Sequence, residues 1–281
     1  MNSPRIIRTV AGLRYVLKSE IDLGKTIGFV PTMGALHEGH ASLLKRARPE
    51  VDLLVTSIYA NPTQFDNQDD LNNYPKTETK DLELLKREQT DIAFIPQTAD
   101  VYYNLNVTPI DYGALTNTLE GAHRPGHFDG MSTIVRRLFQ IVTPHRAYFG
   151  EKDWQQLAII NRMSSVESLG IRVIGCEIMR EPSGLALSSR NVHLTSQEKK
   201  AALAISQSIS EVINRLSSVP LSQLELEIID RLKLAGLEPD YVKIINAATF
   251  EALQPGANLG QGRLLIAAHS GKTRLIDNGP V

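Results

Sequence analysis

Two histidines, three residues apart, are the residues whose type and spacing most clearly suggest chemistry. His37 and His40 lie in the string HEGH, after an apolar run at residues 27–30 and a turn at residues 31–34. On the first turn of a helix this spacing puts both rings on the same side. Imidazoles there can donate hydrogen bonds to a triphosphate and to the charge that builds as one of its bonds breaks. Gly39 between them lets a nucleotide approach the backbone, so the pair predicts a phosphate site.

The elements around the pair favour this interpretation. The β-branched run at 27–30 indicates a buried strand, and a helix is expected from about Gly39 until Pro49 ends it. A strand, a glycine-bearing turn and a helix place backbone N–H groups and a positive helix dipole at the carboxyl edge of a sheet. Two alternatives stay open, a pair of surface histidines and half of a zinc site. This pair does not have the His-x-x-x-His spacing of a helical zinc site, and no third ligand cluster accompanies it.

Apolar periodicity predicts the elements that must position this site. Further buried strands are expected at 53–59, 92–95, 147–149 and 171–178, and helices at 5–20, 78–89, 131–142 and 154–169. This alternation predicts an α/β fold with a doubly wound parallel sheet. We expect a mobile loop at 66–74. We expect an irregular segment at 97–130, which is long enough to suggest a function.

The composition changes after Arg180, where we expect a second domain. The segment that follows contains Ser, Gly and Pro. Helical patterns then occur at 196–216 and 221–235, and β-like runs at 241–246 and 263–268. The sequence therefore predicts one domain over residues 1–180 and a smaller C-terminal α+β domain over residues 181–281.

Composition and charge exclude several classes of protein. The chain has 281 residues, 42% hydrophobic and 22% charged, which is typical of a soluble globular protein. A formal net charge of −1 argues against nucleic-acid and membrane partners. The first ten residues lack a signal-peptide core, and no run approaches the roughly 18 apolar residues that span a bilayer. Cys176 lies in an apolar run and is expected to be a buried thiol. We expect a cytoplasmic enzyme.

Two basic groups elsewhere in the chain could also contact phosphate. Lys152 lies on the turn before the helix expected at 154–169, where a cation is unfavourable unless an anion neutralises it. Alternatively, it is an exposed lysine paired with Glu151 or Asp153. Residues 187–190, with two serines and an arginine, suit multidentate phosphate binding, or they cap a helix or form a turn.

Further polar residues have types that could bind small molecules or ions. The amides of Asn61 and Gln64 could orient a small polar acid, or merely cap a turn. Asp81, early in a helix, could hold a divalent cation, or it is a surface acid favoured by the helix dipole. Arg124 and His127 lie in a Pro-Gly turn, and the pattern assigns neither a role.

Longer strings resemble a known family. HEGH after a strand is similar to the His-x-Gly-His signature of the adenylyl-transferring superfamily, and residues 187–190 partly resemble its Lys-Met-Ser-Lys-Ser loop. The string PTMGALHEGH is more specific and resembles the pantoate–β-alanine ligase family. The resemblance continues over nearly the whole chain through NPTQF, YPKT, LEGAHRPGHFDGMSTIV, FGEKDWQQL, GLALSSRN and TRLIDN. It implies a Rossmann-like N-terminal domain, a C-terminal lid domain and a homodimer.

The resemblance also implies a reaction. The carboxylate of pantoate attacks the α-phosphorus of ATP, which gives pantoyl adenylate and pyrophosphate. The amine of β-alanine then attacks the acyl carbon, which gives pantothenate and AMP. ATP with Mg²⁺ is the implied nucleotide. Adenylation is needed because a carboxylate is a poor acyl donor.

Roles for individual residues follow from the same resemblance. His37, His40, Lys152 and Arg190 would be the catalytic groups, the last two by neutralising the β- and γ-phosphates. We expect the rings to stabilise charge, since phosphoryl transfer needs little proton movement at the attacking carboxylate. The implied ATP-binding residues are Pro31, Thr32, Met33, Gly34, Ala35, Leu36, His37, Glu38, Gly39, His40, Gly150, Glu151, Lys152, Asp153, Met179, Leu187, Ser188, Ser189 and Arg190.

The remaining implied roles concern the acid, the amine and the metal. Gln64 would hold pantoate and contact β-alanine, Gln156 would hold pantoate, and Asn61 would orient β-alanine or the adenylate. Asp81 matches a magnesium-binding acid, although Lys80 stands where the family often has another acid. Another small-molecule adenylyltransferase and a non-catalytic ATP-binding protein are the alternatives. A tRNA-charging enzyme would need an anticodon-binding domain and a basic surface.

Overall fold

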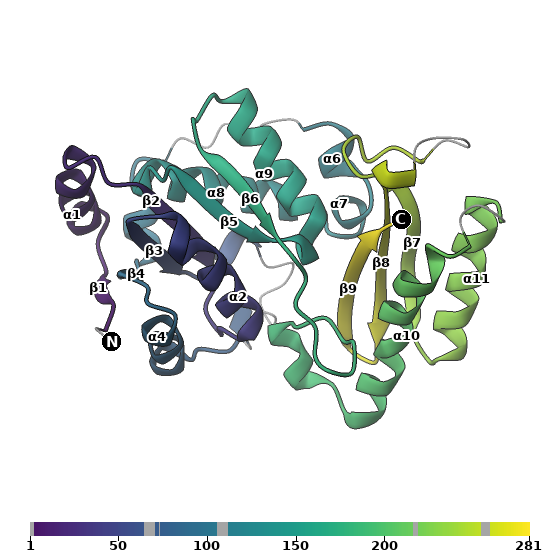
Figure 1. The fold of residues 1–281 in the computed structure, drawn as a ribbon. Coiled ribbons are helices and arrows are strands. Elements are labelled where there is room, and N and C mark those ends of the chain that lie inside the picture. Colours follow the sequence, from purple (N-terminus) through teal and green to yellow (C-terminus); the bar gives the residue numbers. More distant parts are fainter. Residues whose placement is uncertain (1–2, 65–70, 73, 106–111, 216–218, 254–258) are drawn as a thin grey trace. The chain divides into compact units, whose positions relative to one another are not determined.

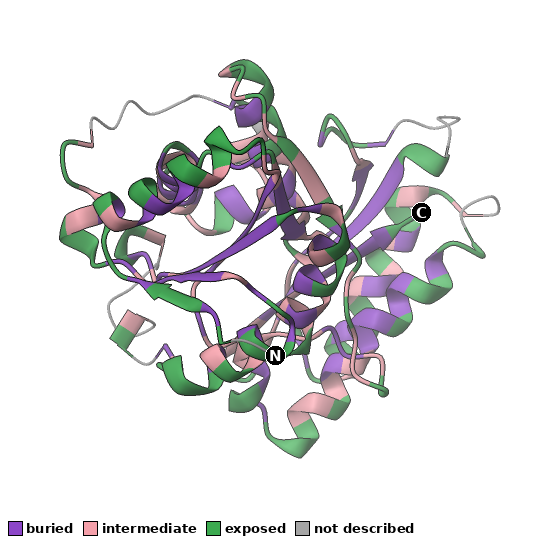
Figure 2. Ribbon diagram, turned by 60° about the vertical axis from the view of Figure 1, so that its left-hand side comes forward, coloured by how far each residue is buried: buried purple, intermediate pink, exposed green. Residues whose placement is uncertain are grey.

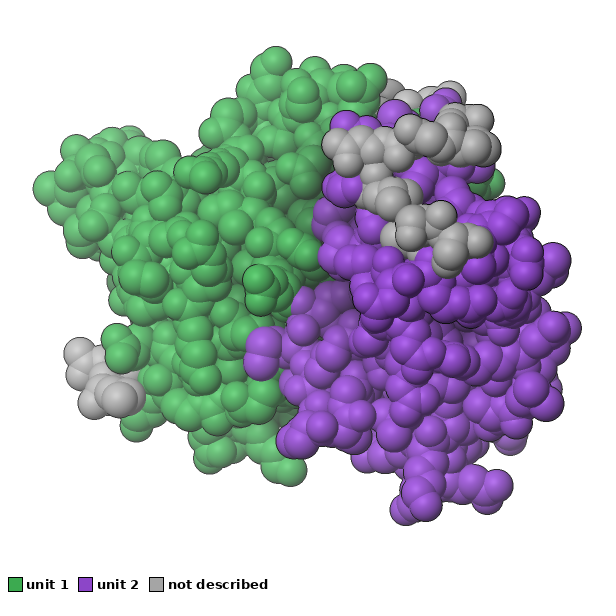
Figure 3. All heavy atoms as spheres, turned by 45° about the vertical axis from the view of Figure 1, so that its right-hand side comes forward, with its two compact units in different colours: residues 1–151, 155–177 green, residues 152–154, 178–281 purple. Residues whose placement is uncertain are grey.

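The computed structural model describes residues 3–64, 71–72, 74–105, 112–215, 219–253 and 259–281 (Figure 1). Most of the loop expected at 66–74, residues 106–111 of the segment expected to be irregular, and the end of the helix expected at 196–216 lie outside them. The chain divides into two compact units, coloured separately in Figure 3. Unit 1 comprises residues 1–151 and 155–177, and unit 2 comprises residues 152–154 and 178–281.

Unit 1 is built on a parallel sheet, as the sequence predicted; it has six strands, one more than expected. Its strands, in spatial order, are β1 (Arg5–Ile7), β4 (Ile92–Phe94), β3 (Leu53–Ile58), β2 (Ile27–Thr32), β5 (Arg146–Gly150) and β6 (Arg172–Cys176). The chain proceeds from β2 toward β3 and later resumes on the other side at β5. The carboxyl end of β2 therefore lies where the strand order reverses, which is where open α/β sheets bind ligands.

Helices cover both faces of this sheet. They are α1 (Val10–Asp22), α2 (Glu38–Ala47), α4 (Glu78–Arg87), α8 (His127–Val142) and α9 (Trp154–Val166). Alternate residues of β2 face opposite sides: Val30 packs in one cluster with Leu44 of α2 and Leu85 of α4, whereas Phe29 contacts Phe139 of α8. Buried residues accordingly run along the strands and along one side of each helix (Figure 2).

Strand register brings two loops of interest to one edge. Thr32 at the end of β2 pairs with Ile58 at the end of β3. Because the strands are parallel, the segments that follow them leave the same carboxyl edge side by side. One leads to the histidine pair through residues 33–37, and the other leads to the 3₁₀ turn η2 (Pro62–Gln64).

Two segments of unit 1 differ from expectation. Residues 5–20 do not form one helix: the β-branched pair at Ile6 and Ile7 belongs to β1, which pairs with β4, and α1 starts only after the N-cap Thr9. The segment expected to be irregular contains the short helices α5 (Thr98–Val101), α6 (Ala114–Asn117) and α7 (Glu120–His123). Helix α8 also begins earlier than expected, at His127, and Gly130 of its first turn packs against Thr63 of η2.

Unit 2 is a small α+β unit with its own core. A three-stranded antiparallel sheet, β7 (Glu238–Asn246), β8 (Gly262–Ser270) and β9 (Thr273–Pro280), packs with α10 (Ser196–Val212) and α11 (Leu221–Leu234). Short 3₁₀ turns η3 (Glu151–Asp153) and η4 (Ser189–His193) carry residues of interest. Strand β9 escaped the sequence analysis because buried polar residues, Asp277 and Asn278, interrupt its apolar pattern. None of the helices in the described ranges is long and apolar enough to span a bilayer.

Candidate active site

The histidine pair caps the start of α2 with its own rings. His37 is the N-cap residue, and its Nδ1 accepts a hydrogen bond from the Gly39 amide at 3.1 Å. The Nδ1 of His40 in turn accepts from the His37 amide at 3.2 Å. The two ring centroids lie 4.2 Å apart. Reciprocal bonds of this kind form a capping box, which fixes both rings without help from a ligand.

These bonds also fix the tautomer of each ring. An Nδ1 atom that accepts a hydrogen bond carries no proton, so the proton of each neutral ring is on Nε2. Burial of the His40 ring, and secondly the neighbouring His37, lower the pKa of His40 to about 3. The His40 ring is therefore neutral at physiological pH. It can donate a hydrogen bond from Nε2, but it carries no positive charge.

The loop before α2 is folded around the carboxylate of Asp81. Asp81 is buried, and its Oδ2 and Oδ1 accept from the amides of Ala35 at 3.1 Å and Leu36 at 2.8 Å. The Thr77 hydroxyl donates to Oδ1 at 3.0 Å. Gly34 has a φ of +85°, and a Cβ there would lie 3.2 Å from Asp81 Oδ2. Both the backbone conformation and the close carboxylate therefore require glycine.

The loop uses most of its own amides. Gly34 N donates to the Thr32 hydroxyl at 3.2 Å, in addition to the bonds of Ala35 and Leu36 to Asp81 and of His37 to His40. We expected backbone N–H groups of this turn to bind phosphate, but these four already have partners. The anion-binding groups that the loop offers are the two imidazoles rather than this run of amides.

Asp81 does not fit the magnesium role expected from the sequence. Both of its oxygens accept bonds from the protein, and its neighbour Lys80 is a cation. Among the residues that the structure describes, no group of three or more His, Cys, Asp or Glu side chains could hold a metal ion. A site for Mg²⁺ needs several oxygen ligands in near-octahedral geometry. Asp81 therefore stabilises the loop before α2, and no part of the reaction is attributed to a metal at this carboxylate.

Asn61 is the centre of a hydrogen-bond network rather than a free substrate ligand. Its side chain is 1% exposed, and its Nδ2 donates to the Thr63 hydroxyl at 2.9 Å and to Gly130 O at 3.3 Å. Its Oδ1 accepts from the Tyr102 hydroxyl at 2.7 Å. The network holds η2 against α8. A Cβ on Gly130 would lie 2.2 Å from Thr63 O, so only glycine permits this contact.

Gln64 is placed by two residues that the sequence left without a role. The Gln64 carbonyl accepts from Nδ1 of His127 at 2.9 Å, and Arg124 donates to Nε2 of the same ring at 3.1 Å. Because a carbonyl can only accept, His127 carries its proton on Nδ1. This chain of bonds fixes the backbone of Gln64, whose partly exposed side chain makes no hydrogen bond among the described residues.

Adjacent glutamines at the start of α9 have different surroundings. Gln155 is 2% exposed, and its side chain donates to Leu115 O and Thr118 O and accepts from the Glu120 amide. It therefore ties α9 to the segment with α6 and α7. Gln156, the expected pantoate ligand, is partly exposed and makes no side-chain hydrogen bond within the described part of the chain.

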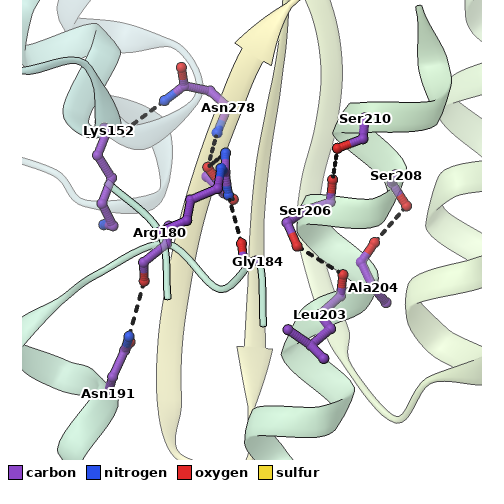
Figure 4. Close-up of polar contacts among 12 residues, drawn as sticks. Lys152, Arg180, Gly184, Asn191, Leu203, Ala204, Ser206, Ser208, Ser210 and Asn278 are labelled. Carbon is purple, nitrogen blue, oxygen red and sulfur yellow. Dashed lines mark hydrogen bonds and ion pairs between the residues drawn. The ribbon is translucent and has the colours of Figure 1, made fainter. Parts of the chain in front are cut away.

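The other expected phosphate ligands belong to unit 2. Lys152 lies in η3, as predicted for the turn between β5 and α9, and its carbonyl accepts from Asn278 (Figure 4). Leu187 N donates to Met179 O at 2.9 Å, and the Ser188 hydroxyl accepts from Arg190 N at 3.3 Å. The structure thus brings residues 31–40, Asn61 and Gln64 to one sheet edge within unit 1. It groups Lys152 and Asp153 with Met179 and 187–190 in unit 2.

Comparison with known proteins indicates the same family as the sequence motifs do. The family model described as pantoate-beta-alanine ligase matches residues 5–280. The chain belongs to the pantoate-beta-alanine ligase family. It is 42% identical to the pantothenate synthetase of Clostridium botulinum (strain Kyoto / Type A2), over 97% of this chain and 98% of that protein. It is also 42% identical to the pantothenate synthetase of Thermotoga neapolitana, over 98% of each chain.

Solved structures of pantothenate synthetases share the fold over at least 98% of this chain. A structure of the Thermus thermophilus protein aligns with a TM-score of 0.90 at 36% identity, covering 98% of this chain and 99% of that one. The Francisella tularensis pantoate-beta-alanine ligase aligns with a TM-score of 0.81, at 36% identity, over 99% of this chain and 100% of that one. That structure is of a complex with beta-gamma ATP and beta-alanine.

The sequence analysis did not single out three buried polar residues that bond to the backbone or to charged side chains of the protein. Gln155, Asp277 and Asn278 are all buried and hydrogen-bonded. Gln155 lies in the motif FGEKDWQQL, and Asp277 and Asn278 lie in TRLIDN. Apolar periodicity does not indicate which polar residue of a motif is buried. The TRLIDN string, at the end of the resemblance, was the available signal for the last two.

Proposed function

We propose that this protein condenses pantoate with β-alanine at the expense of ATP, forming pantothenate, AMP and pyrophosphate through pantoyl adenylate. The observation that carries the proposal is the histidine pair, held as two neutral Nε2–H donors at the switch point of the sheet in a chain whose residues 5–280 match the family. The complex of the related Francisella tularensis protein with beta-gamma ATP and beta-alanine supports the same substrates.

In the first step, a pantoate oxygen forms a bond to the α-phosphorus of ATP. The bond from that phosphorus to the bridging oxygen breaks, and its electron pair leaves with pyrophosphate. His37 and His40 donate hydrogen bonds from Nε2 to the phosphate oxygens, where negative charge builds. Lys152 and Arg190 neutralise the β- and γ-phosphates that become the leaving group. Because burial lowers the pKa of His40 to about 3, its ring enters the reaction neutral and acts as a hydrogen-bond donor rather than as a cation.

In the second step, the neutral amine of β-alanine attacks the acyl carbon of the adenylate. The carbon–oxygen bond to the phosphate breaks, AMP leaves with the electron pair, and the new amide nitrogen loses a proton to solvent. Gln64 and Gln156 hold pantoate, and Gln64 also contacts β-alanine. Asn61 acts by placing the η2 turn rather than by binding substrate itself, since both ends of its side-chain amide are already bonded.

The remaining assignments follow the family. Pro31 to His40, Gly150 to Asp153, Met179 and Leu187 to Arg190 line the ATP site. Mg²⁺ would be supplied on the phosphates of ATP, as part of the substrate, and would neutralise their charge. The domain of residues 181–281 acts as the lid, and the protein works as a cytoplasmic homodimer.

The assay that tests this function separates the two steps. Pantoate alone should support exchange of labelled pyrophosphate into ATP, and AMP should be released only when β-alanine is added. Exchange with another acid but not pantoate would identify a different small-molecule adenylyltransferase. ATP binding without any exchange would identify a non-catalytic nucleotide-binding protein.

A further inference from the structure

Two neighbouring polar residues are buried on strand β9. Asp277 is 5% exposed and Asn278 is 2% exposed. A buried carboxylate and a buried amide are costly unless hydrogen-bonded, so their partners show what they hold. Those partners lie on the two segments of unit 2 that carry the expected phosphate ligands (Figure 4).

Asn278 holds the turn that bears Lys152. Its Nδ2 donates to the Lys152 carbonyl at 2.8 Å, and its Oδ1 accepts from Nε of Arg263 at 2.6 Å. The two bonds use opposite ends of the side-chain amide, so they fix its orientation. Residues 152–154 group with unit 2 although the residues on both sides of them belong to unit 1.

The same turn has a second anchor at Trp154. The guanidinium carbon of Arg263 lies 3.5 Å from the centre of the Trp154 ring. The indole Nε1 donates to the Ala247 carbonyl at 3.2 Å. Arg263 therefore links Asn278 to Trp154, and the 152–154 turn is held by both its backbone and its aromatic side chain.

Asp277 holds the hairpin that leads to Arg190. Its carboxylate accepts two bonds from the guanidinium of Arg180, at 2.5 and 2.9 Å. The same guanidinium donates to Gly184 O at 3.1 Å, which closes the turn between the bridged residues Arg180 and Ala186. The main-chain N–H of Asn278 also donates to Asp277 Oδ1 at 2.8 Å, so the two anchors are one connected network.

We infer that Asp277 and Asn278 are positioning residues that hold the Lys152 turn and the 187–190 segment in a fixed relation to each other. The inference rests on the proposed function, in which Lys152 and Arg190 neutralise the phosphates of ATP. A lysine ammonium has a flexible four-carbon stem, so its placement depends on a well-held backbone. The network supplies that support and makes the two cationic segments move as one body.

The substitution Asn278→Asp tests the first anchor. It keeps an oxygen acceptor for Arg263 but replaces the donor to Lys152 O by a second oxygen. ATP should bind about tenfold more weakly, while AMP, which lacks the β- and γ-phosphates, should bind as in the wild type. In a Lys152→Ala background, Asn278→Asp should change ATP affinity less than about twofold. An equal loss in both backgrounds, or an equal loss for AMP, would overturn the inference.

Trp154 gives a readout that does not depend on activity. It is the only tryptophan of the chain, so acrylamide quenching of fluorescence reports on the 152–154 turn. Without nucleotide, Asn278→Asp should increase quenching, and Asn278→Ser, which adds no charge, should do the same. The matched control Asp240→Asn breaks an ion pair with Arg274 on the same sheet and should leave quenching unchanged. Wild-type quenching in both Asn278 variants would disprove the anchor.

The second anchor is tested with Asp277→Asn, which should weaken ATP binding in the wild type but add little in an Arg190→Ala background. Full additivity there would overturn this half of the inference. Failure of the proposed function has a different signature: the wild type would show no pantoate-dependent exchange, while quenching of Trp154 would still decide the anchoring.

Discussion

The Nδ1 of His40 accepts a hydrogen bond from the main-chain amide of His37 at 3.2 Å. This single bond makes His40 part of the helix cap and also fixes how its ring can contact a ligand. It orients the His40 ring, assigns its proton to Nε2 and commits the ring to donating hydrogen bonds. The predictions below depend on such relationships between a functional side chain and the backbone that holds it.

Substitution of His40 by Ala should lower pantoate-dependent pyrophosphate exchange on the order of 10²- to 10³-fold, because one donor to the transition state is lost. Steady-state exchange at saturating ATP and pantoate measures this. His269→Ala, at a partly exposed histidine near Asp240, is the matched control and should keep full activity. Normal exchange in His40→Ala would remove His40 from the catalytic groups.

The neutral His40 ring also predicts how stability depends on pH. An unfolded histidine titrates near pH 6.5, whereas the pKa of His40 in the folded protein is about 3. Between these values the unfolded state binds more protons than the folded state. The contribution of His40 to the free energy of unfolding is therefore complete above about pH 6.5 and is lost as the pH falls. Urea unfolding should show that the wild type loses about 1–2 kcal/mol more than His40→Asn between about pH 7 and about pH 5. Equal losses would mean that the ring is hydrated.

Asp81→Asn should disturb the histidine loop without changing the use of magnesium. The amide keeps one oxygen for the loop amides but turns an N–H₂ group toward another donor. We expect a loss of about 2 kcal/mol in the free energy of unfolding and about a tenfold lower exchange rate. The Mg²⁺ concentration for half-maximal activity should stay the same. Recovery of activity at high Mg²⁺ would instead make Asp81 a metal ligand. Glu83→Gln, elsewhere on α4, is the control.

Substitutions of Gln64, Gln155 and Gln156 should distinguish residues that bind pantoate from a residue that stabilises the fold. Gln64→Ala and Gln156→Ala should raise the KM for pantoate more than the KM for ATP, because their side chains are partly exposed and can meet the acid. Gln155→Ala removes three hydrogen bonds from a buried site, so it should lower the unfolding free energy by about 2–3 kcal/mol. It should change the KM for pantoate little. Equal effects of Gln64→Ala on both substrates would indicate a structural role for Gln64.

Several features of this protein were determined by local sequence alone. Apolar runs of strand length separated by helical periodicity predicted the parallel sheet, and the glycine-bearing turn before HEGH placed the histidine pair at its carboxyl edge. These predictions succeed because burial of apolar residues and turn chemistry act over a few neighbouring positions. The long motif strings were enough to indicate the family.

Tertiary structure decided what the polar residues do. Asp81, expected on a metal, bonds to amides 45 and 46 positions away, and Asn278 reaches a carbonyl 126 positions away. Strand β1 was also missed, since its place depends on pairing with the distant strand β4. Strand β9 was missed because its buried polar residues break the apolar pattern. A polar side chain has the same identity whether it meets solvent, a ligand or a buried amide. Only the folded chain, by bringing distant donors and acceptors together, determines which of these it meets.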